Sequence, residues 1–358
     1  MYKIMTPGPT QVRENVRNAR SRECTNPDLD VAFVEYYKET CELISELLNT
    51  KNETFILDGE GILGLEAACA SLTEPGDKVL VLDNGIYGKG FGDFVKMYGG
   101  EVTYYSTAYD EALSVDELRT FLETNHDFKY ATMVHCDTPS GMLNPVEELS
   151  KELHKYNILT VVDSVSAMFG EKLNIDNGQI DIACGGSQKA LSAPPGLTFV
   201  TVSEAALKAM EDRKYPIASF YANILAFKNY YEEKWFPYTM PISDIYGLRQ
   251  ALDNIKEDTT LYERHSKLAE YTRNELAKLG LKLYAKNGYS NTVSAFCVPE
   301  GHTAEEILDK MLSKYNIMLA GSFDVFAGKL IRIGHMGENA NEKDVKDTLT
   351  ALAEILRE

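Results

Sequence analysis

The fold is decided by the stretch Gly185-Gly186-Ser187-Gln188-Lys189-Ala190-Leu191-Ser192-Ala193-Pro194-Pro195-Gly196. The apolar run before it, Ile180 to Cys184, is typical of a buried strand, and the Pro-Pro-Gly end prevents continuation as a helix. Small neighbours allow the amine of Lys189 to be partly desolvated, which lowers its pKa and prepares it to form a Schiff base with an aldehyde. The stretch therefore predicts a reactive lysine at the end of a buried strand.

A carboxylate stands at the end of the preceding predicted strand. The run from Ile158 to Val162 is apolar and β-branched, and it delivers Asp163 at its C-terminal end, where ligands bind in open α/β sheets. Asp163 precedes Lys189 by 26 residues, so both side chains can reach the same sheet edge. Pyridoxal phosphate requires such a lysine, and a carboxylate that keeps its ring nitrogen protonated. Taken singly, either residue could be a surface lysine or a helix cap.

These residues resemble a known enzyme family. Asp163-Ser164-Val165-Ser166, together with the stretch from Ser187 to Gly196, is similar to the class V aminotransferases. The similar branch holds the alanine–glyoxylate, serine–pyruvate and 2-aminoethylphosphonate–pyruvate transaminases, and the resemblance extends from Pro7-Gly8-Pro9 to Arg332-Ile333-Gly334. It implies a fold-type I α/β enzyme that works as a homodimer with shared active sites. Its large domain would hold a mostly parallel sheet flanked by helices, and its C-terminal domain would be a small α/β unit.

The chain is long enough for two domains, and its composition excludes some partners. With 358 residues it can bury a large core. A formal net charge of −18 makes nucleic acid and anionic membranes poor partners. The six cysteines form no CxxC pair, so we expect neither disulfides nor a metal site. No signal-peptide core and no long apolar span occurs, which favours a cytoplasmic protein.

Alternating strand and helix patterns indicate three parts. Residues 1–25 lack periodicity and are expected to form an extended arm without packed elements. Residues 26–245 alternate helices and strands, as expected of a large cofactor-binding domain with a parallel sheet. Residues 246–358 begin with a long linking helix and continue as a small domain. Its expected strands lie near 281–284, 293–298 and 330–333.

A glycine-rich turn at Asp58-Gly59-Glu60-Gly61-Ile62-Leu63-Gly64 precedes the helix predicted from Leu65 to Leu72. Its glycines spell G-x-G-x-x-G, and Asp83 follows at the spacing of a ribose-binding acid, so a dinucleotide site is an alternative. In the resembling family this loop grips the cofactor phosphate through a serine or threonine. Glu60 stands there instead and carries like charge, so we assign phosphate contact to the backbone of Gly61 and Ile62.

The resemblance assigns further cofactor contacts. Tyr87 is expected to stack on the cofactor ring and Val165 to pack on its other face. Thr138 is expected to hydrogen-bond the cofactor or substrate, and Gln188, which adjoins the reactive lysine, is expected to contact the cofactor. His135 ends an apolar strand without metal-type partners, and we interpret it as a core residue.

One segment rich in aromatic residues is expected at the subunit interface. Residues 215–238 contain nine aromatic side chains, which indicates a buried inter-subunit surface. By resemblance, Thr239 and Tyr238 would reach the phosphate of the partner subunit's site. Phe236 stands where a tyrosine is common, so Tyr238 is the candidate for that hydroxyl contact.

Substrate binding is assigned to Arg332 and to the segment around Gly8. A guanidinium fork suits an amino-acid carboxylate, and the family uses this arginine for that purpose. We expect transfer of an amino group from an alanine- or serine-type donor to glyoxylate or pyruvate, with Lys189 as the proton carrier.

Three alternatives remain from the sequence. A 2-aminoethylphosphonate donor would need extra cations, for which Arg17, Arg20 and Arg22 are available. The glycine-rich turn and Asp83 permit an NAD-dependent dehydrogenase. Glu60 and Phe236 make a non-catalytic relative that binds pyridoxal phosphate conceivable.

Overall fold

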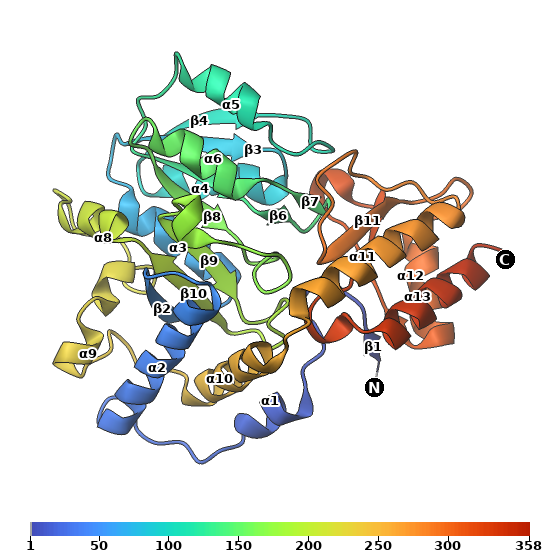
Figure 1. The fold of residues 1–358 in the computed structure, drawn as a ribbon, viewed down its shortest axis with the longest axis horizontal. Coiled ribbons are helices and arrows are strands. Elements are labelled where there is room, and N and C mark those ends of the chain that lie inside the picture. The colour runs from blue at the N-terminus through green and yellow to red at the C-terminus, as the bar shows by residue number, and fades with distance from the viewer. Residues whose placement is uncertain (1) are drawn as a thin grey trace.

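The computed structural model describes residues 2–358, whose largest element is a seven-stranded sheet (Figure 1). The strand order is β2-β10-β9-β8-β5-β3-β4. The strands are β2 (Glu53–Asp58), β3 (Lys78–Asp83), β4 (Glu101–Ser106), β5 (Tyr130–Val134), β8 (Leu159–Asp163), β9 (Ile182–Gly186) and β10 (Leu197–Val202). Only β10 is antiparallel to its neighbours, β2 and β9. The expected mostly parallel sheet is confirmed, with β10 as a strand that the sequence did not indicate.

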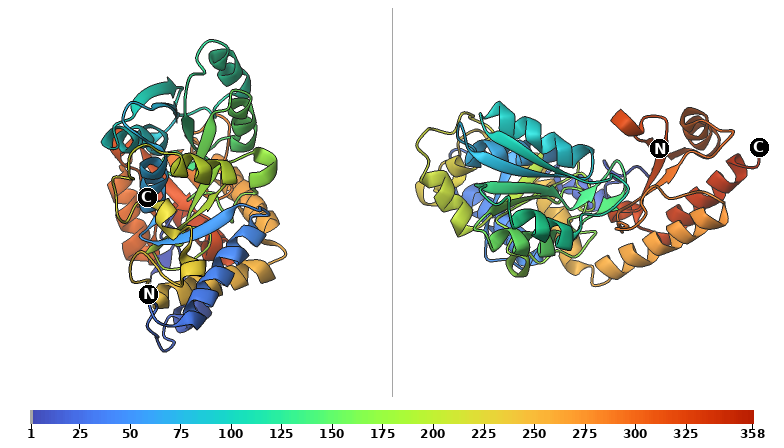
Figure 2. Two further views of the ribbon diagram at one scale, coloured as in Figure 1. Left: turned by 90° about the vertical axis from the view of Figure 1, so that its left-hand side faces the viewer. Right: turned by 90° about the horizontal axis from the view of Figure 1, so that it is seen from above.

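Helices lie on both faces of this sheet (Figure 2). They are α2 (Val31–Leu47), α3 (Gly61–Leu72), α4 (Ile86–Met97), α5 (Val115–Leu122), α6 (Val146–His154), α7 (Ile175–Gly178), α8 (Glu204–Glu211), α9 (Tyr230–Glu233), α10 (Ile242–Glu257) and the 3₁₀ turn η1 (Ile224–Phe227). Helix α3 packs on β9 and β10, and α4 packs on β3 and β4. Because α3 begins at Gly61 and not at Leu65, part of the glycine-rich turn is its first turn.

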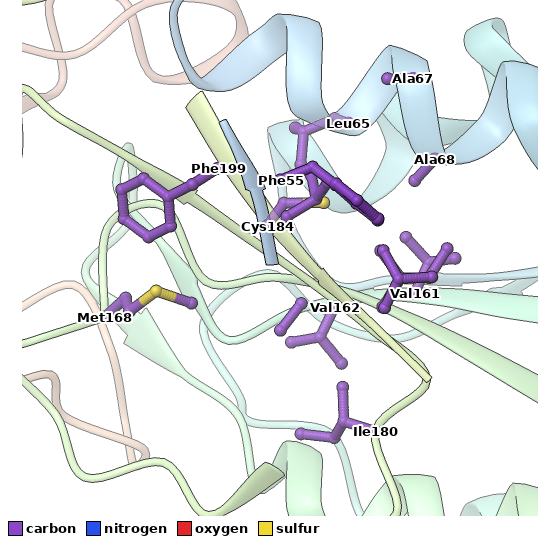
Figure 3. Packing of buried hydrophobic residues seen from close by; sticks show 14 of the residues in the cluster. Phe55, Leu65, Ala67, Ala68, Val161, Val162, Met168, Ile180, Cys184 and Phe199 are labelled. Atoms are coloured by element: carbon purple, nitrogen blue, oxygen red, sulfur yellow. The ribbon is translucent and has the colours of Figure 1, made fainter. Parts of the chain in front are cut away.

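Strand β9, which leads to Lys189, lies in the large apolar core. Helix α3 brings Leu65 close to Phe55 and Cys184, as Figure 3 shows. A Cβ atom on Gly185 would lie 2.2 Å from Cε2 of Phe199, so this glycine lets the ring pack directly on the strand. Strand β9 is therefore held tightly between α3 and the ring of Phe199.

The C-terminal residues form a second unit with its own apolar core. It contains a three-stranded antiparallel sheet in the order β11-β14-β13, beside one end of the large sheet (Figure 1). Its elements are α11 (Leu261–Lys278), β11 (Val293–Cys297), α12 (Ala304–Tyr315), β12 (Ile317–Met318), β13 (Ala320–Gly321), η2 (Asp324–Phe326), β14 (Leu330–Gly334), η3 (Gly337–Asn339) and α13 (Glu342–Ile355).

The N-terminal arm is packed, so its prediction as an extended segment without packed elements is wrong. Strand β1 (Lys3–Ile4) pairs in parallel with β12, and Met5 is fully buried in the C-terminal core. Helix α1 (Glu14–Ala19) packs on α10. The arm thus joins the two units, because β12 belongs to the C-terminal unit and α10 belongs to the larger core. Both partners lie more than 200 residues away in the sequence.

Two other expectations concern the C-terminal unit. The strand expected near 281–284 is absent, since only Leu283 forms an isolated bridge, to Phe296. The division at residue 245 stays a prediction. Helix α10 runs across it, and its buried side chains belong to the larger core.

Among residues 2–358, no helix combines the length and the apolar character needed to cross a membrane.

Candidate active site

A cavity lies where β8 and β9 end and α3 begins. Eight of the predicted site residues line it. Its lining consists of Glu60, Gly61, Ile62, Leu65, Tyr87, Thr138, Asp163, Val165, Ser166, Gln188 and Lys189. The sheet topology explains this gathering, because parallel neighbouring strands carry their C-terminal loops to one edge.

Lys189 follows the end of β9 and is partly buried. Its Nζ donates a hydrogen bond of 2.6 Å to the carbonyl oxygen of Pro7. Burial, and then the positive charge of Arg332, lower the pKa of the amine to about 8. A substantial fraction of the amine is therefore neutral near pH 8, as a nucleophile or general base requires.

Asp163 ends β8 and lines the same cavity as Lys189. Its Oδ1 accepts a hydrogen bond of 2.9 Å from the backbone N–H of Val165. Burial raises the pKa of the carboxyl to about 7. A buried carboxyl with a free oxygen suits a protonated ring nitrogen, which would stabilise its charged form.

The loop after β5 contains an acidic residue that the sequence analysis did not single out. Asp137, in the hairpin of β6 (Cys136–Asp137) and β7 (Met142–Leu143), accepts hydrogen bonds from the Tyr87 N–H at 3.1 Å and from Ser140 Oγ at 2.7 Å. A Cβ on Gly85 would lie 2.4 Å from its carboxyl carbon. Burial raises the pKa of Asp137 to about 6. Asp137 thus fixes the backbone that carries Tyr87. Its position next to Thr138 in the sequence could have identified it as a site residue.

Glu60 lies at the N-terminal end of α3, where its side chain makes no capping hydrogen bond. Its Oε2 accepts one hydrogen bond, of 3.4 Å, from Nε2 of Gln188. The other amide atom of Gln188, Oε1, is buried and has no hydrogen-bond partner among the described residues. The side chains at this end of the cavity therefore present more acceptors than donors.

Arg332, on β14, approaches the cavity from the C-terminal unit. Its Nε and Nη2 donate to the carbonyl oxygen of Gly321 at 2.9 and 2.6 Å, and Nη1 lies 3.4 Å from the carbonyl oxygen of Thr138. The guanidinium lies 5.7 Å from the ring centroid of Phe323. Burial lowers its pKa, but from a starting value so high that the group stays charged.

The N-terminal arm completes the surroundings of Lys189. A Cβ on Gly8 would lie 2.4 Å from Cδ of Lys189, so only glycine permits this close approach. Thr10 Oγ1 donates to the carbonyl oxygen of Lys189 at 3.0 Å and lies 3.0 Å from Ser192 Oγ. Ser192 in turn accepts from the N–H of Glu338 at 2.9 Å. Thr10 and Ser192 therefore tie the lysine loop to both units, a role that their sequence context did not indicate.

The two residues assigned to a partner subunit's site lie outside the cavity of their own chain. The Tyr238 hydroxyl accepts a hydrogen bond of 3.4 Å from the N–H of Asp58, and Thr239 donates to Asp28 at 3.3 Å. Some aromatic side chains of the segment 215–238 are buried within the chain and others are exposed. Phe227, Tyr230 and Phe236 are buried in the chain's own core, so its description as one interface surface is wrong in part. Its exposed aromatic residues are Tyr215, Phe220, Tyr221 and Trp235.

The other candidate residues lie in ordinary structural surroundings. His135 is buried, its Nδ1 lies 3.0 Å from Ser164 Oγ, and burial lowers its pKa to about 4. Asp83 is buried and accepts a hydrogen bond from Ser106 at 2.9 Å. A Cβ on Gly64 would lie 2.4 Å from Thr198 Oγ1, so this glycine serves packing between α3 and β10.

Comparison with known proteins connects this geometry to a family. The aminotransferase class-V profile matches residues 7–328. The pyridoxamine–pyruvate transaminase of Mesorhizobium japonicum is 32% identical over 97% of this chain and 90% of its own. The ureidoglycine–glyoxylate aminotransferase structure from Bacillus subtilis has a TM-score of 0.96 at 29% identity, covering 100% of this chain and 93% of its own.

A further solved structure, the alanine–glyoxylate aminotransferase from Nostoc sp., has a TM-score of 0.95 at 30% identity. It covers 99% of this chain and 95% of its own. The match along nearly the whole chain removes the dehydrogenase alternative and the non-catalytic alternative. The chain belongs to the class-V aminotransferases, pyridoxal phosphate-dependent enzymes of fold-type I.

Proposed function

We propose that this aminotransferase moves an amino group from a small amino acid, of the alanine or serine type, to glyoxylate or pyruvate. The main support is that Lys189 and Asp163, at the ends of adjacent strands, line one cavity. The guanidinium of Arg332 lies beside this cavity. The names of the compared relatives support the acceptor. Their donors vary between alanine, ureidoglycine and pyridoxamine, whereas each acceptor is glyoxylate or pyruvate.

The cavity fits the ring of the cofactor. Asp163 would hold the proton on the ring nitrogen, and Tyr87 and Val165 offer flat and branched apolar surfaces for the two ring faces. Thr138 supplies a hydroxyl group. The phosphate end fits less well. The N–H groups of the first turn of α3 are suitable donors, but the Glu60 carboxylate stands beside them.

The bound cofactor supplies an electron-withdrawing ring that makes the donor's Cα–H bond acidic. The neutral Lys189 amine would take that proton at Nζ and hold it as the general base of the site. Asp163, while ionised, holds the ring-nitrogen proton in place. Asp163 is buried and Lys189 is partly buried, so little water can compete for these protons.

Arg332 binds the carboxylate common to the amino donor and the oxo-acid acceptor. Gly321 and Thr138 hold the guanidinium by their carbonyl oxygens, so its remaining N–H groups keep a fixed direction. A carboxylate bound there has a fixed orientation, which in turn aligns the Cα–H bond toward Lys189.

The 2-aminoethylphosphonate alternative lacks nearby cations. Arg20 pairs with Asp244, Arg17 donates to the carbonyl oxygen of Val12, and Arg22 lies over the ring of Tyr246. None of the three lines the cavity. An amino-acid donor, which needs only Arg332, is therefore better supported.

A homodimer with shared sites, in the cytoplasm, completes the proposal. In it, Tyr238 and Thr239 of a second copy would approach the phosphate end of the cavity. The exposed Phe220, Tyr221 and Trp235 support an interface, since aromatic side chains are enriched in such surfaces.

A donor panel tests the proposed function. Purified enzyme is supplied with glyoxylate or pyruvate and with alanine, serine, aspartate or 2-aminoethylphosphonate, and the amino products are quantified. We expect turnover with alanine or serine, and none in the Lys189→Ala variant. Faster turnover of 2-aminoethylphosphonate would reverse the donor assignment, and transfer from no donor would overturn the function.

A further inference from the structure

The end of the cavity at the start of α3 has an unusual chemistry for a phosphate site. We call it the Glu60 end. It consists of the Glu60 carboxylate, the amide of Gln188, and the backbone N–H groups of Gly61 and Ile62. The two N–H groups lie in the first turn of α3 and have no carbonyl within the helix to bond. A ligand group at this end can therefore accept hydrogen bonds from the helix.

The side chains of Glu60 and Gln188 favour a ligand group that donates a hydrogen bond. Glu60 has four lone-pair positions and receives one hydrogen bond, the 3.4 Å contact from Gln188. Gln188 is 7% exposed, and its Oε1 has no donor within residues 2–358. A buried acceptor without a donor is costly, so Gln188 Oε1 favours a ligand that brings a hydrogen. The exposed Glu60 carboxylate can accept such a hydrogen as well.

The charges at the Glu60 end also favour a neutral hydrogen-bond donor over a phosphate. Among the described residues, Lys189 is the only basic side chain that lines the cavity, and its nitrogen is needed for the chemistry. Glu60 and Asp163 are both acidic. A phosphate monoester carries a charge near −2 at neutral pH and offers acceptor oxygens to Glu60 and to Gln188 Oε1. A hydroxymethyl group is neutral, can donate to Glu60 and can accept from the N–H groups of α3.

We propose that the Glu60 end selects unphosphorylated forms of the cofactor, pyridoxal and pyridoxamine, over their 5′-phosphates. This inference rests on the proposed function, since it uses the same Lys189, Asp163 and Arg332. Without a phosphate anchor the vitamer leaves the site after each exchange. It is then a substrate, and pyridoxamine is an amino donor beside the amino acid of the proposed function.

The exchange is balanced without a further reactant. The bond between C4′ and nitrogen in pyridoxamine breaks, and a bond between that nitrogen and C2 of pyruvate forms. C4′ is oxidised to an aldehyde while C2 is reduced to the amine-bearing carbon of alanine. Lys189 carries the proton from C4′ to C2, and the water lost when the amine condenses with the ketone is regained on hydrolysis.

The test compares four vitamers with the purified full-length protein. Dissociation constants for pyridoxal and pyridoxal phosphate are measured from the absorbance of the lysine-bound aldehyde. Turnover is measured with pyruvate and either pyridoxamine or its phosphate. The variant Glu60→Gln removes the charge, and Glu66→Gln is the control. Glu66 lies on the same helix and accepts a hydrogen bond from Tyr98, outside the cavity. Melting temperatures verify that both variants fold.

We expect pyridoxal to bind the wild-type protein at least as tightly as pyridoxal phosphate, and pyridoxamine to give many equivalents of free pyridoxal. Glu60→Gln should shift the ratio of the two dissociation constants by about tenfold toward the phosphate, as for a solvent-exposed unit charge facing a dianion. Glu66→Gln should leave the ratio unchanged.

Each of the following results would overturn the inference: tighter binding of the phosphate by the wild-type protein, a reaction that stops at one equivalent, or an unchanged ratio in Glu60→Gln. Alanine formation from pyridoxamine phosphate alone would refute this selectivity and leave the proposed function standing. Alanine formation from neither amine would refute the proposed function itself.

Discussion

Replacement of Arg332 tests how the substrate carboxylate is bound. The guanidinium is 8% exposed and is held by the carbonyl oxygens of Gly321 and Thr138. A carboxylate about 4 Å from this charge gains about 4 kcal/mol at the effective dielectric constant of such partly buried sites. Arg332→Gln removes that attraction, so kcat/KM for pyruvate should fall about 10³-fold.

Arg332→Lys separates charge from geometry. The lysine keeps the positive charge but loses the planar fork, and with it one of two parallel charge-assisted hydrogen bonds worth about 1.5 to 3 kcal/mol. We expect kcat/KM to fall between about 10-fold and 100-fold, an intermediate loss.

The assay is alanine formation from pyruvate at subsaturating concentration, and a donor amine without a carboxylate is tested in parallel. Arg273→Gln is the control, because Arg273 lies in the same C-terminal unit and donates to the carbonyl oxygen of Ser290, outside the cavity. A loss of less than threefold in kcat/KM for pyruvate in Arg332→Gln, or an equal loss in kcat/KM for the donor that lacks a carboxylate, would refute carboxylate binding by Arg332.

Two further predictions concern Asp163 and Gly8. Burial raises the pKa of Asp163 to about 7, above an ordinary value near 3.9, so the ligand-free protein loses stability as the pH rises from about 4 through 7. Urea unfolding should then show Asp163→Asn to be more stable than wild type at pH 8, by up to about 4 kcal/mol, and equal at pH 4; equal stability at pH 8 would contradict this. Gly8→Ala should reduce kcat at least about tenfold, because its Cβ would lie 2.4 Å from Cδ of Lys189. Gly301→Ala has a similar φ of +86° with no atom within 4 Å of its Cβ, so it should keep full activity, and equal activity of the two variants would refute the contact.

The parts of the site that local sequence patterns encode were predictable. Buried parallel strands are recognisable as apolar runs, so the ends of β8 and β9, with Asp163 and Lys189, followed directly. The glycine-rich turn likewise indicated the helix α3, although its start was expected at Leu65 and lies at Gly61. Glu60 in this turn already marked the conflict with a phosphate.

The parts that depend on distant contacts were not predictable. Strand β10 is apolar like its neighbours, and nothing in its local pattern encodes an antiparallel direction. Met5 is buried by residues of the C-terminal unit, and Lys3 pairs with Ile317. Thr10 acts on Lys189 through a contact across 179 residues. Such pairings arise from the assembled fold, so the arm was expected to be unpacked.

Covalent trapping at Lys189 tests the central claim most directly. The protein is incubated with pyridoxal or pyridoxal phosphate, reduced with borohydride, digested and analysed by mass spectrometry. The account predicts one stable adduct, on the peptide that contains Lys189, and its loss in Lys189→Ala. An unmodified Lys189 peptide, or adducts confined to other lysines, would contradict it.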